Sequence, residues 1–268
     1  MFLEYLEFIL YGLIQGLTEF IPVSSTAHLK IISGLFGIND PGSSLSAIIQ
    51  LGSVFALTWY FRNDFSKLTN HSLKRIFDYS IYVHLLKSIL IGTLPIIFLG
   101  GTIKLFIPNF FDNILRSNLS IALVSFLMAI FMYLADSSKK GALNLKNHSF
   151  SDSLFIGLSQ ALAIIPGVSR SGVTISTALV LGWDRGDAAK FSFLLGIPAI
   201  SIAAIVEFIS SFRDLSSIGF LPLIIGLITT FFSSLIAIDF LLKYFSSNGL
   251  KLFIIYRILF GVAILLNL

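Results

Sequence analysis

The chain has 268 residues, of which 56% are hydrophobic and only 12% are charged, and its formal net charge is +4. Soluble domains carry about 25% charged residues, so this composition excludes a soluble globular protein, which could not cover its surface with so few charges. The chain has no cysteine, which excludes disulfides, thiolate metal sites and cysteine nucleophiles. No stretch resembles a basic surface with interleaved aromatic residues, so no nucleic-acid partner is expected.

Apolar runs of about 20 residues, the length that a membrane-spanning helix needs, recur from one end of the chain to the other. The strands of a membrane β-barrel would instead show alternating polar and apolar residues. We therefore expect an all-α polytopic membrane protein, folded as a single membrane domain over residues 1–268.

The first half of the chain starts with an interrupted helix. An apolar helix over residues 1–21 is expected to end before Pro22, because proline lacks the backbone donor that would continue the run. The next piece, residues 24–38, starts with hydroxyl residues that favour helix N-caps and is too short to span a membrane comfortably. The two pieces together predict a re-entrant helical hairpin. Spanning helices are expected next at residues 42–61, 81–106 and 118–135.

The second half shows the same order of elements. Residues 151–165 and 169–182 form another short pair around Pro166 and Gly167, and they predict a second re-entrant hairpin. Spanning helices are then expected at residues 187–211, 218–245 and 250–267, which brings the number of transmembrane helices to about six.

A repeat links the two interrupted segments, QGLTEFIPVSSTAH at residues 15–28 and QALAIIPGVSRSG at residues 160–172. The first repeat extends over about residues 1–110 and the second over about residues 150–268. Proline-interrupted apolar segments in corresponding halves of a membrane protein indicate broken helices that meet at a binding site. A shift of 145 positions places Gln15, Leu17, Val23 and Ser24 on Gln160, Leu162, Val168 and Ser169.

Lysine and arginine residues in short loops predict the orientation in the membrane. The loops at residues 62–80 and 136–150 are the most basic, so both are expected in the cytoplasm. The first hairpin then enters from the outer face and the second from the cytoplasmic face. This arrangement gives the two repeats inverted topology and leaves both termini outside.

Ionisable residues within membrane segments are costly and indicate functional sites. Gln15 and Glu19 are four residues apart and therefore share a helix face. A carboxylate oxygen and an amide oxygen form a hard pair that suits Mg²⁺ or Ca²⁺. The structural alternative is a buried hydrogen-bonded pair that only packs helices.

The hydroxyl residues Ser24, Ser25 and Thr26 follow the first break, and His28 comes soon after. Ser25 and His28 are three residues apart, so the imidazole is expected to approach the hydroxyl or to face the same ligand. A serine beside a general base is an activatable nucleophile. For Ser24, an N-capping role is at least as good an interpretation.

The second break combines a glycine, hydroxyl groups, an arginine and a helix N-terminus in Ser169, Arg170 and Ser171. Free backbone N–H groups and positive charge together bind phosphate. The alternative is that Arg170 only neutralises a buried carboxylate such as Glu19. Taken with the first break, this segment points to phosphoester or diphosphate hydrolysis in the membrane.

The other charged residues of the apolar segments are weaker candidates for the site. Asp239 and Lys243 are four residues apart and are expected to pair near a helix end. Lys190, Glu207 and Arg257 could line a cavity, but we expect structural or snorkelling roles for them.

Two motifs give the chain a family resemblance. Over essentially its whole length the chain resembles the bacterial undecaprenyl-diphosphate phosphatases, also called the bacitracin-resistance or BacA family. The family pattern E/Q-x-x-x-E followed by P-V-S-S-T-x-H is met by Gln15, Glu19, Pro22, Ser24, Ser25, Thr26 and His28. The pattern P-G-x-S-R-S-x-x-T is met by Pro166, Gly167, Ser169, Arg170, Ser171 and Thr174. Gln15 stands where many relatives have glutamate, so metal binding is expected to be weaker or to differ in its pH dependence.

The resemblance implies hydrolysis of undecaprenyl diphosphate to undecaprenyl phosphate and inorganic phosphate. This reaction recycles the lipid carrier of cell-wall synthesis, and overexpression of such an enzyme confers resistance to bacitracin. The resemblance also implies a divalent cation (Mg²⁺ or Ca²⁺) and an active site that opens to the outer, periplasmic side of the cytoplasmic membrane. The expected partners are the polyprenyl diphosphate, membrane lipids and, as one option, a second copy of the chain.

Roles for individual residues follow from the resemblance and the spacing together. Glu19 and Gln15 are expected to hold the metal, and Ser25 to attack the terminal phosphorus while His28 handles protons. His28 as the nucleophile, or direct activation of water, stays open. A transporter that flips the lipid phosphate is the alternative from another class, because inverted repeats serve alternating access. Substrate contacts are expected from Ser24, Thr26, Ser169, Arg170, Ser171 and Thr174.

Overall fold

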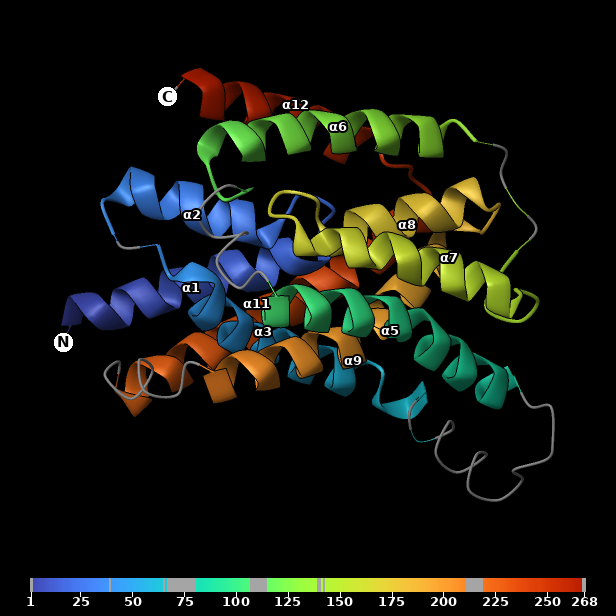
Figure 1. Cartoon of the computed structure of the whole chain (residues 1–268), viewed down its shortest axis with the longest axis horizontal. Helices are drawn as coiled ribbons and strands as arrows, with labels where there is room; N and C mark the ends of the chain where they lie inside the picture. The colour runs from blue at the N-terminus through green and yellow to red at the C-terminus, as the bar shows by residue number, and fades with distance from the viewer. Residues whose placement is uncertain are drawn as a thin grey trace.

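A computed structural model describes residues 2–38, 40–64, 66, 81–106, 115–138, 141, 143–210 and 219–266 (Figure 1). Its described residues form helices and no β-strand, which confirms the all-α prediction. The first half contains α1 (Phe2–Phe20), α2 (Ser25–Phe36), α3 (Gly42–Tyr60), α5 (Ile81–Phe106) and α6 (Asn118–Asp136). The second half contains α7 (Phe150–Ala161), the 3₁₀ turn η2 (Leu162–Ile164), α8 (Arg170–Val180), α9 (Arg185–Ser210), α11 (Phe220–Phe245) and α12 (Lys251–Leu266).

Four helices among the described residues, α5, α6, α9 and α11, are long and apolar enough to cross a membrane. They are four of the six predicted spans. Of the remaining two, α3 has 19 residues, as many as α6. By contrast, α12 with its 16 residues is about 24 Å long, less than the roughly 30 Å of a hydrocarbon core. Most of the predicted basic loop at residues 62–80, including Lys67, Lys74 and Arg75, lies outside the described residues, as do Lys139 and Lys140 of the second loop.

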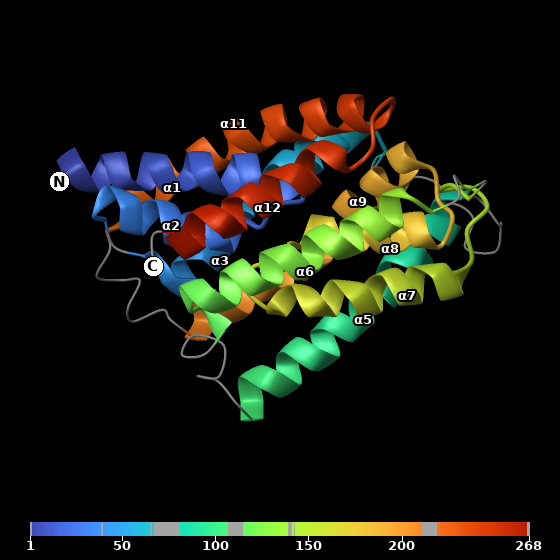
Figure 2. The ribbon, with the colours of Figure 1, turned by 90° about the horizontal axis from the view of Figure 1, so that it is seen from above.

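Small residues let α1 and α11 pack closely side by side (Figure 2). A Cβ atom on Gly12 would overlap Thr229 of α11, and one on Gly16 would overlap Ser233. The contacts advance together along both helices, so α1 and α11 run in the same direction. Membrane helices associate through such small faces because lipid offers no hydrophobic driving force between them.

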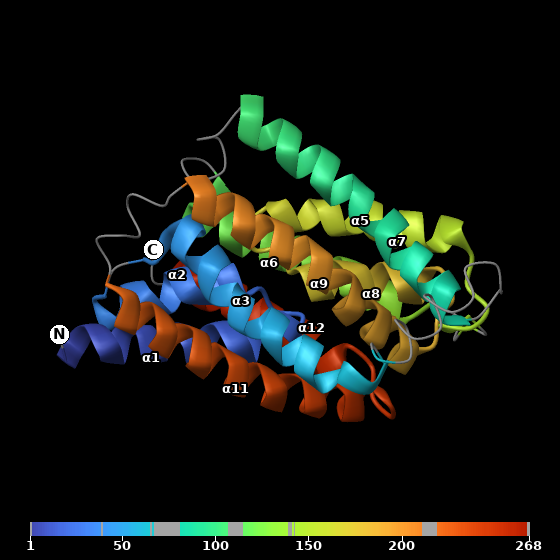
Figure 3. The same cartoon turned by 90° about the horizontal axis from the view of Figure 1, so that it is seen from below.

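The same device joins α5 and α7, which also pack side by side (Figure 3). A Cβ on Gly157 of α7 would overlap the backbone of Gly92 on α5, and one on Gly92 would approach Ser153. Gly12 and Gly157 have the same offset as the two sequence motifs. Each glycine therefore forms a close contact between a helix of its own half and a helix of the other half.

Two reversals of the chain place polar residues in the middle of the molecule. The chain turns back between α1 and α2, and again between η2 and α8. In Figure 1, α1 and α2 open toward the end that holds the N-terminus, whereas α7 and α8 open toward the opposite end. The two reversals therefore meet near the centre, with α6 and α12 packed together as a layer over them.

Both reversals contain a strained serine. Ser24 has φ of 78° and Ser169 has φ of 69°, and these are the only positive φ values of non-glycine residues in the described part of the chain. Positive φ is costly for a residue with a Cβ and persists where the surrounding structure imposes it, often at functional sites. The two serines occupy equivalent positions in the two halves, as the N-cap residues of α2 and α8.

Candidate active site

The carboxylate of Glu19, in the last turn of α1, links groups from both reversals. Its Oε2 atom accepts hydrogen bonds from Gln15 Nε2 at 2.7 Å and from Ser25 Oγ at 2.8 Å. Its Oε1 atom lies 3.2 Å from Arg170 Nη2 and forms an ion pair with it. Burial makes such a charged group costly unless it is paired, so Glu19 and Arg170 hold the two halves together electrostatically.

Ser25 is the first residue of α2, directly after the strained Ser24. Its hydroxyl donates to the Glu19 carboxylate, which is the arrangement that a serine nucleophile and its general base require. Both residues are buried, with 8% of Ser25 and 7% of Glu19 exposed. Water is thereby limited around the pair while the hydroxyl stays positioned on the carboxylate.

Arg170 is held in place by α9. Its Nη1 atom donates to the carbonyl of Ser192 at 3.2 Å, and Ser192 in turn shares a 2.6 Å hydroxyl contact with Thr174. The guanidinium lies directly against Gly196, where any Cβ atom would overlap it. The Nε–H of Arg170 has no hydrogen-bond partner among the residues that the structure describes, so no described contact with the fold uses this donor.

His28 faces away from Ser25, contrary to the expectation from their spacing. Its Nδ1 lies 2.7 Å from the carbonyl of Ser24, and its Nε2 lies 2.6 Å from the hydroxyl of Tyr256 on α12. The ring also stacks on Phe260, with centroids 4.3 Å apart. Because a carbonyl only accepts, Nδ1 carries the proton and Nε2 of the neutral ring accepts from Tyr256. Both nitrogens are therefore occupied.

Arg257 of α12 connects the two reversals directly. Its guanidinium is fully buried and donates to three carbonyls: Pro22 at 2.7 Å, Gly167 at 3.0 Å and Val168 at 2.8 Å. The first of these carbonyls belongs to the first reversal and the other two to the second. The structural role expected for Arg257 is confirmed, and the residue holds the two breaks next to each other.

The remaining hydroxyl residues of the motifs mainly support the reversals. Ser24 Oγ contacts Thr26 Oγ1 at 3.2 Å, and Ser169 Oγ accepts from the backbone N–H of Gly172 as an N-cap. Ser171 Oγ donates to the carbonyl of Ile21 at 3.3 Å, across the two halves. The N-cap role considered for Ser24 is realised through its position, but its side chain makes no capping hydrogen bond.

Some of these groups line a cavity of about 190 Å³. The polar lining comes from the two reversals and α3, and the apolar lining from α5, η2 and α9. The polar residues are Glu19, Ser24, Ser25, Thr26, Gln50, Ser169 and Arg170, and the apolar residues are Ile96, Ala163, Ile164, Ala199, Ile200 and Ala203. The cavity therefore offers one polar and one apolar environment side by side, as an amphiphilic ligand requires.

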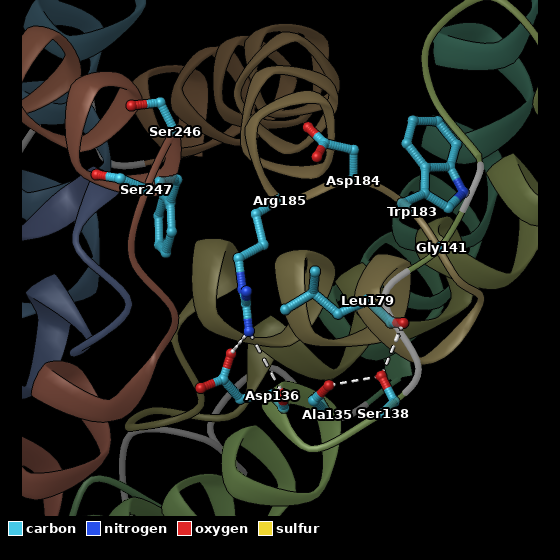
Figure 4. Close-up of a pocket in the computed structure, with 11 residues that line it drawn as sticks. Ala135, Asp136, Ser138, Gly141, Leu179, Trp183, Asp184, Arg185, Ser246 and Ser247 are labelled. Atoms are coloured by element: carbon cyan, nitrogen blue, oxygen red, sulfur yellow. Dashed lines mark hydrogen bonds and ion pairs between the residues drawn. The ribbon is translucent and has the colours of Figure 1, made fainter.

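A second cavity, of about 170 Å³, lies at the end toward which α7 and α8 open (Figure 4). Its arginine, Arg185, is already committed to Asp136, with 2.6 Å between Nη2 and Oδ1. The hydroxyl of Ser138 donates to the carbonyls of Ala135 and Leu179. These contacts tie the ends of α6, α8 and α9 together, and no serine in this lining is paired with a carboxylate as Ser25 is. We therefore assign it a structural role.

The structure thus brings Gln15, Glu19, Ser25 and Arg170 together and places His28 beside them but turned toward α12. Sequence reasoning missed the parts played by Gln50, Ser192 and Tyr256, which come from α3, α9 and α12. The predicted Asp239–Lys243 pair is confirmed at 2.6 Å. The structural roles expected for two further residues are also confirmed: Lys190 pairs with Asp64 at 2.8 Å, and Glu207 accepts from Ser44.

The fold and the site together define a class: a multi-pass helical membrane protein with a buried serine–carboxylate–arginine cluster in its interior. Residues 8–263 match the family model described as bacitracin resistance protein BacA, so the chain belongs to the BacA family. The resemblance seen in the two motifs is confirmed.

Relatives are similar along the whole chain. An undecaprenyl-diphosphatase of Prochlorococcus marinus strain MIT 9312 is 77% identical over 100% of both chains. An undecaprenyl-diphosphatase of strain MIT 9515 is 64% identical over 99% of this chain and 100% of the relative. One of strain MIT 9313 is 46% identical over 95% of this chain and 86% of the relative.

Proposed function

We propose that this protein is a membrane hydrolase that converts undecaprenyl diphosphate to undecaprenyl phosphate and inorganic phosphate, and that it thereby confers bacitracin resistance. The observation that carries the proposal is the Ser25–Glu19–Arg170 cluster, which lines a cavity with an apolar lining on its other side. The names of the relatives support the same reaction. They do not favour the transport alternative, which would also leave the hydrogen bond between Ser25 and Glu19 without a chemical use.

In the first step, the Ser25 oxygen attacks the terminal phosphorus of the diphosphate. Glu19 Oε2, which already accepts the hydroxyl hydrogen bond at 2.8 Å, takes the proton. The bond from the terminal phosphorus to the bridging oxygen breaks, and undecaprenyl phosphate leaves with that oxygen. In the second step, water attacks the phosphorus of the phosphoserine, and the bond from phosphorus to Ser25 Oγ breaks. Glu19 returns its proton to the Ser25 oxygen, and inorganic phosphate leaves with the protons of the water.

Arg170 supplies positive charge where the phosphate oxygens lie. Its ion pair with Glu19 means that the alternative considered from the sequence, neutralisation of a buried carboxylate, is also part of the arrangement. The two roles agree, because the guanidinium can hold the carboxylate in the resting protein and still direct its uncommitted Nε–H to the substrate. Phosphoryl transfer depends mostly on such charge stabilisation and positioning.

His28 acts as a positioning residue in this proposal. With both ring nitrogens bonded, to Ser24 O and Tyr256 OH, the imidazole has no free nitrogen for Ser25. By holding the Ser24 carbonyl, it stabilises the positive-φ turn that presents Ser25. This geometry supports serine over histidine as the nucleophile.

A divalent cation fits the donor set on Glu19 and Gln15. Gln15 Oε1 is buried and has no hydrogen-bond partner within the described part of the chain, which leaves an amide oxygen next to the carboxylate. The described residues contain no cluster of three His, Cys, Asp or Glu side chains, so further ligands would be hydroxyls, water and substrate phosphate oxygens, as is common for Mg²⁺. Bound there, Mg²⁺ or Ca²⁺ would neutralise negative charge on the phosphates.

The proposal includes the membrane arrangement. We place the two reversals as re-entrant hairpins of an inverted repeat, the first entering from the periplasmic side of the cytoplasmic membrane. Three observations support it: the matched strained serines Ser24 and Ser169, the matched contacts of Gly12 and Gly157, and the opposite directions in which the two hairpins open. A homodimer stays a prediction.

Phosphate release by the purified protein from undecaprenyl diphosphate tests the proposal. We expect release that EDTA reduces, that Mg²⁺ restores, and that falls by at least about 10³-fold in Arg170→Ala, since the mutation removes both substrate charge and the partner of Glu19. A folded wild-type protein that releases no phosphate with either cation would refute the enzyme. Measured flux of an unhydrolysed lipid phosphate would then favour transport.

A further inference from the structure

The side chain of Gln50 on α3 differs from every other polar residue that lines the active-site cavity. Glu19, Ser25 and Arg170 bond to one another, Ser24 contacts Thr26, and Ser169 accepts from Gly172 N–H. The Gln50 amide lines the cavity but makes no hydrogen bond to another residue in the described part of the protein. An amide at the edge of an apolar interior is costly without a partner, so a ligand is the natural partner here.

The position of Gln50 follows from the packing of α3 on α9. Ser44, near the start of α3, bonds to Glu207, and Asp64, just after α3, pairs with Lys190. The two helices are therefore antiparallel, which sets Gln50 opposite the stretch of α9 that contains Ala199 and Ala203. Both of these small residues line the cavity, and their size leaves room beside the amide.

The guanidinium of Arg170, which belongs to α8, lies against Gly196 on α9. From Gly196 to Ala203, α9 advances by about 10 Å, so the cavity extends from the guanidinium along α9 past Gln50. The apolar lining from Ile96, Ile164 and Ile200 borders this stretch. Gln50 is thus placed where the charged end of the cavity gives way to its apolar part.

We propose that Gln50 Nε2 donates a hydrogen bond to the phosphate group that stays esterified to the lipid, the α-phosphate. This inference rests on the proposed function, which puts the terminal phosphate on Ser25 and Arg170 and the isoprenoid against the apolar lining. The α-phosphate must then lie between them, and Gln50 is the free donor there. Gln50 therefore contributes to the affinity for both the substrate and the lipid phosphate product, because both carry this group.

The chemistry of an amide suits this place. A neutral donor binds a phosphate oxygen without adding a second cation beside Arg170, so the product can leave once the terminal phosphate has gone. A hydrogen bond to a charged group, when removed, changes affinity by about tenfold or more. The loss should appear in binding and in KM, whereas kcat, which depends on Ser25 and Glu19, should stay within about threefold.

The test compares wild type, Gln50→Leu and Gln50→Asn in two measurements: the Kd for undecaprenyl monophosphate in detergent micelles, and KM and kcat with undecaprenyl diphosphate. We expect Gln50→Leu to raise both Kd and KM about tenfold, and Gln50→Asn, which keeps the donor on a shorter side chain, to lie between it and wild type. Gln160→Met is the matched control, because this buried glutamine of α7 does not line the cavity and should leave Kd unchanged.

Direct binding measurements separate the proposed contact of Gln50 from the proposed reaction. If the wild type binds the monophosphate but does not hydrolyse the diphosphate, the proposed reaction fails, and a weaker Kd in Gln50→Leu would still support the contact. An unchanged Kd in folded Gln50→Leu overturns the inference. A loss of kcat at unchanged Kd and KM also overturns it, because Gln50 would then act on the reaction and not on the α-phosphate.

Discussion

The two chain reversals share one backbone design and carry different chemistry. Ser24 and Ser169 hold equivalent positions with φ of 78° and 69°, and each precedes a helix that starts at the centre of the protein. The residue after the first is Ser25, whose hydroxyl bonds to Glu19. The residue after the second is Arg170, which pairs with the same carboxylate. One reversal thus supplies nucleophile and base, and the other supplies positive charge.

This difference shows how a repeated fold can make an asymmetric site. The geometry that presents a side chain at the centre is kept in both halves, while the side chain presented is not. Arg257 then joins the halves through the carbonyls of Pro22, Gly167 and Val168. The site depends on both reversals and on their common clamp, and each can be perturbed separately.

The largest expected effect on activity distinguishes two glycines at corresponding positions of α3 and α9. Gly196→Ala places a methyl group against the Arg170 guanidinium and should lower kcat/KM about 100-fold, since small displacements of a catalytic group have effects of this order. Gly52→Ala instead meets the backbone of Leu227 on α11, so it should lower thermal stability and leave the kcat of folded protein nearly unchanged.

Gly101→Ala is the control for both glycine variants, because a Cβ at Gly101 meets nothing within 4 Å. It should behave as wild type in kinetics and in thermal unfolding. Equal losses of activity in folded Gly196→Ala and Gly52→Ala would contradict the distinction between the two positions.

Replacing Arg257, which bonds to both reversals, is expected to affect the two reversals together. Arg257→Met leaves three buried carbonyls without their donor and should lower the free energy of unfolding by about 3 kcal/mol or more. Thermal unfolding in detergent, measured beside activity, should show a clearly lower Tm and a loss of phosphate release. A Tm equal to that of wild type would mean that the clamp does not hold the breaks together.

A smaller and more selective effect is expected from glycine at the strained serines. Glycine removes the cost of positive φ, about 1–2 kcal/mol, so Ser24→Gly should raise the free energy of unfolding by about 1 kcal/mol. Ser169→Gly also loses the cap on Gly172 N–H, which costs a few tenths of a kcal/mol when glycine replaces serine, so its gain in stability should be smaller than that of Ser24→Gly. Chemical denaturation of both variants checks the difference; equal changes in stability would contradict it.

The smallest effect is expected at one end of the molecule. At the end where α7 and α8 open, burial and then the nearby His84 lower the pKa of His148 below its ordinary value of 6.5. Between the lowered and the ordinary pKa the unfolded chain binds more protons, so stability should fall as pH drops below about 6.5. The difference between the Tm at pH 7.5 and the Tm at pH 5.5 should be smaller in His148→Gln than in wild type. An equal difference in the two proteins would mean that a group other than His148 causes the loss of stability.

Much of the fold could be predicted from the sequence, because apolar run length and proline carry local information. The helix predicted at residues 81–106 has the same bounds in the structure, and the predicted break at Pro22 follows directly after α1. The predicted helix at residues 151–165 instead ends at Ala161 and continues as a 3₁₀ turn. Such tightening of a last turn depends on packing around Pro166 and has no signal in residue type.

In the site, too, features with a local sequence signal could be predicted, and features that depend on packing could not. Glu19, Ser25 and Arg170 were found because charged and hydroxyl residues stand out in apolar sequence. The expectation that His28 turns toward Ser25 was wrong because the partners of His28, Tyr256 and Phe260, lie more than 220 residues away in the sequence. Spacing within one helix carries no information on such distant partners. The role of Gln50 was missed for a related reason: an amide in an apolar helix is recognisable, but the cavity it lines exists only after α3 packs on α9.

The central claim is that the first reversal supplies the nucleophile and the second supplies the charge. Rapid acid quenching of the reaction with diphosphate labelled on its terminal phosphorus, followed by peptide mapping, tests it most directly. We predict phosphoserine at Ser25 in wild type and none in Ser25→Ala, which should also lose phosphate release. Label that survives in Ser25→Ala, on His28 or elsewhere, would contradict the account.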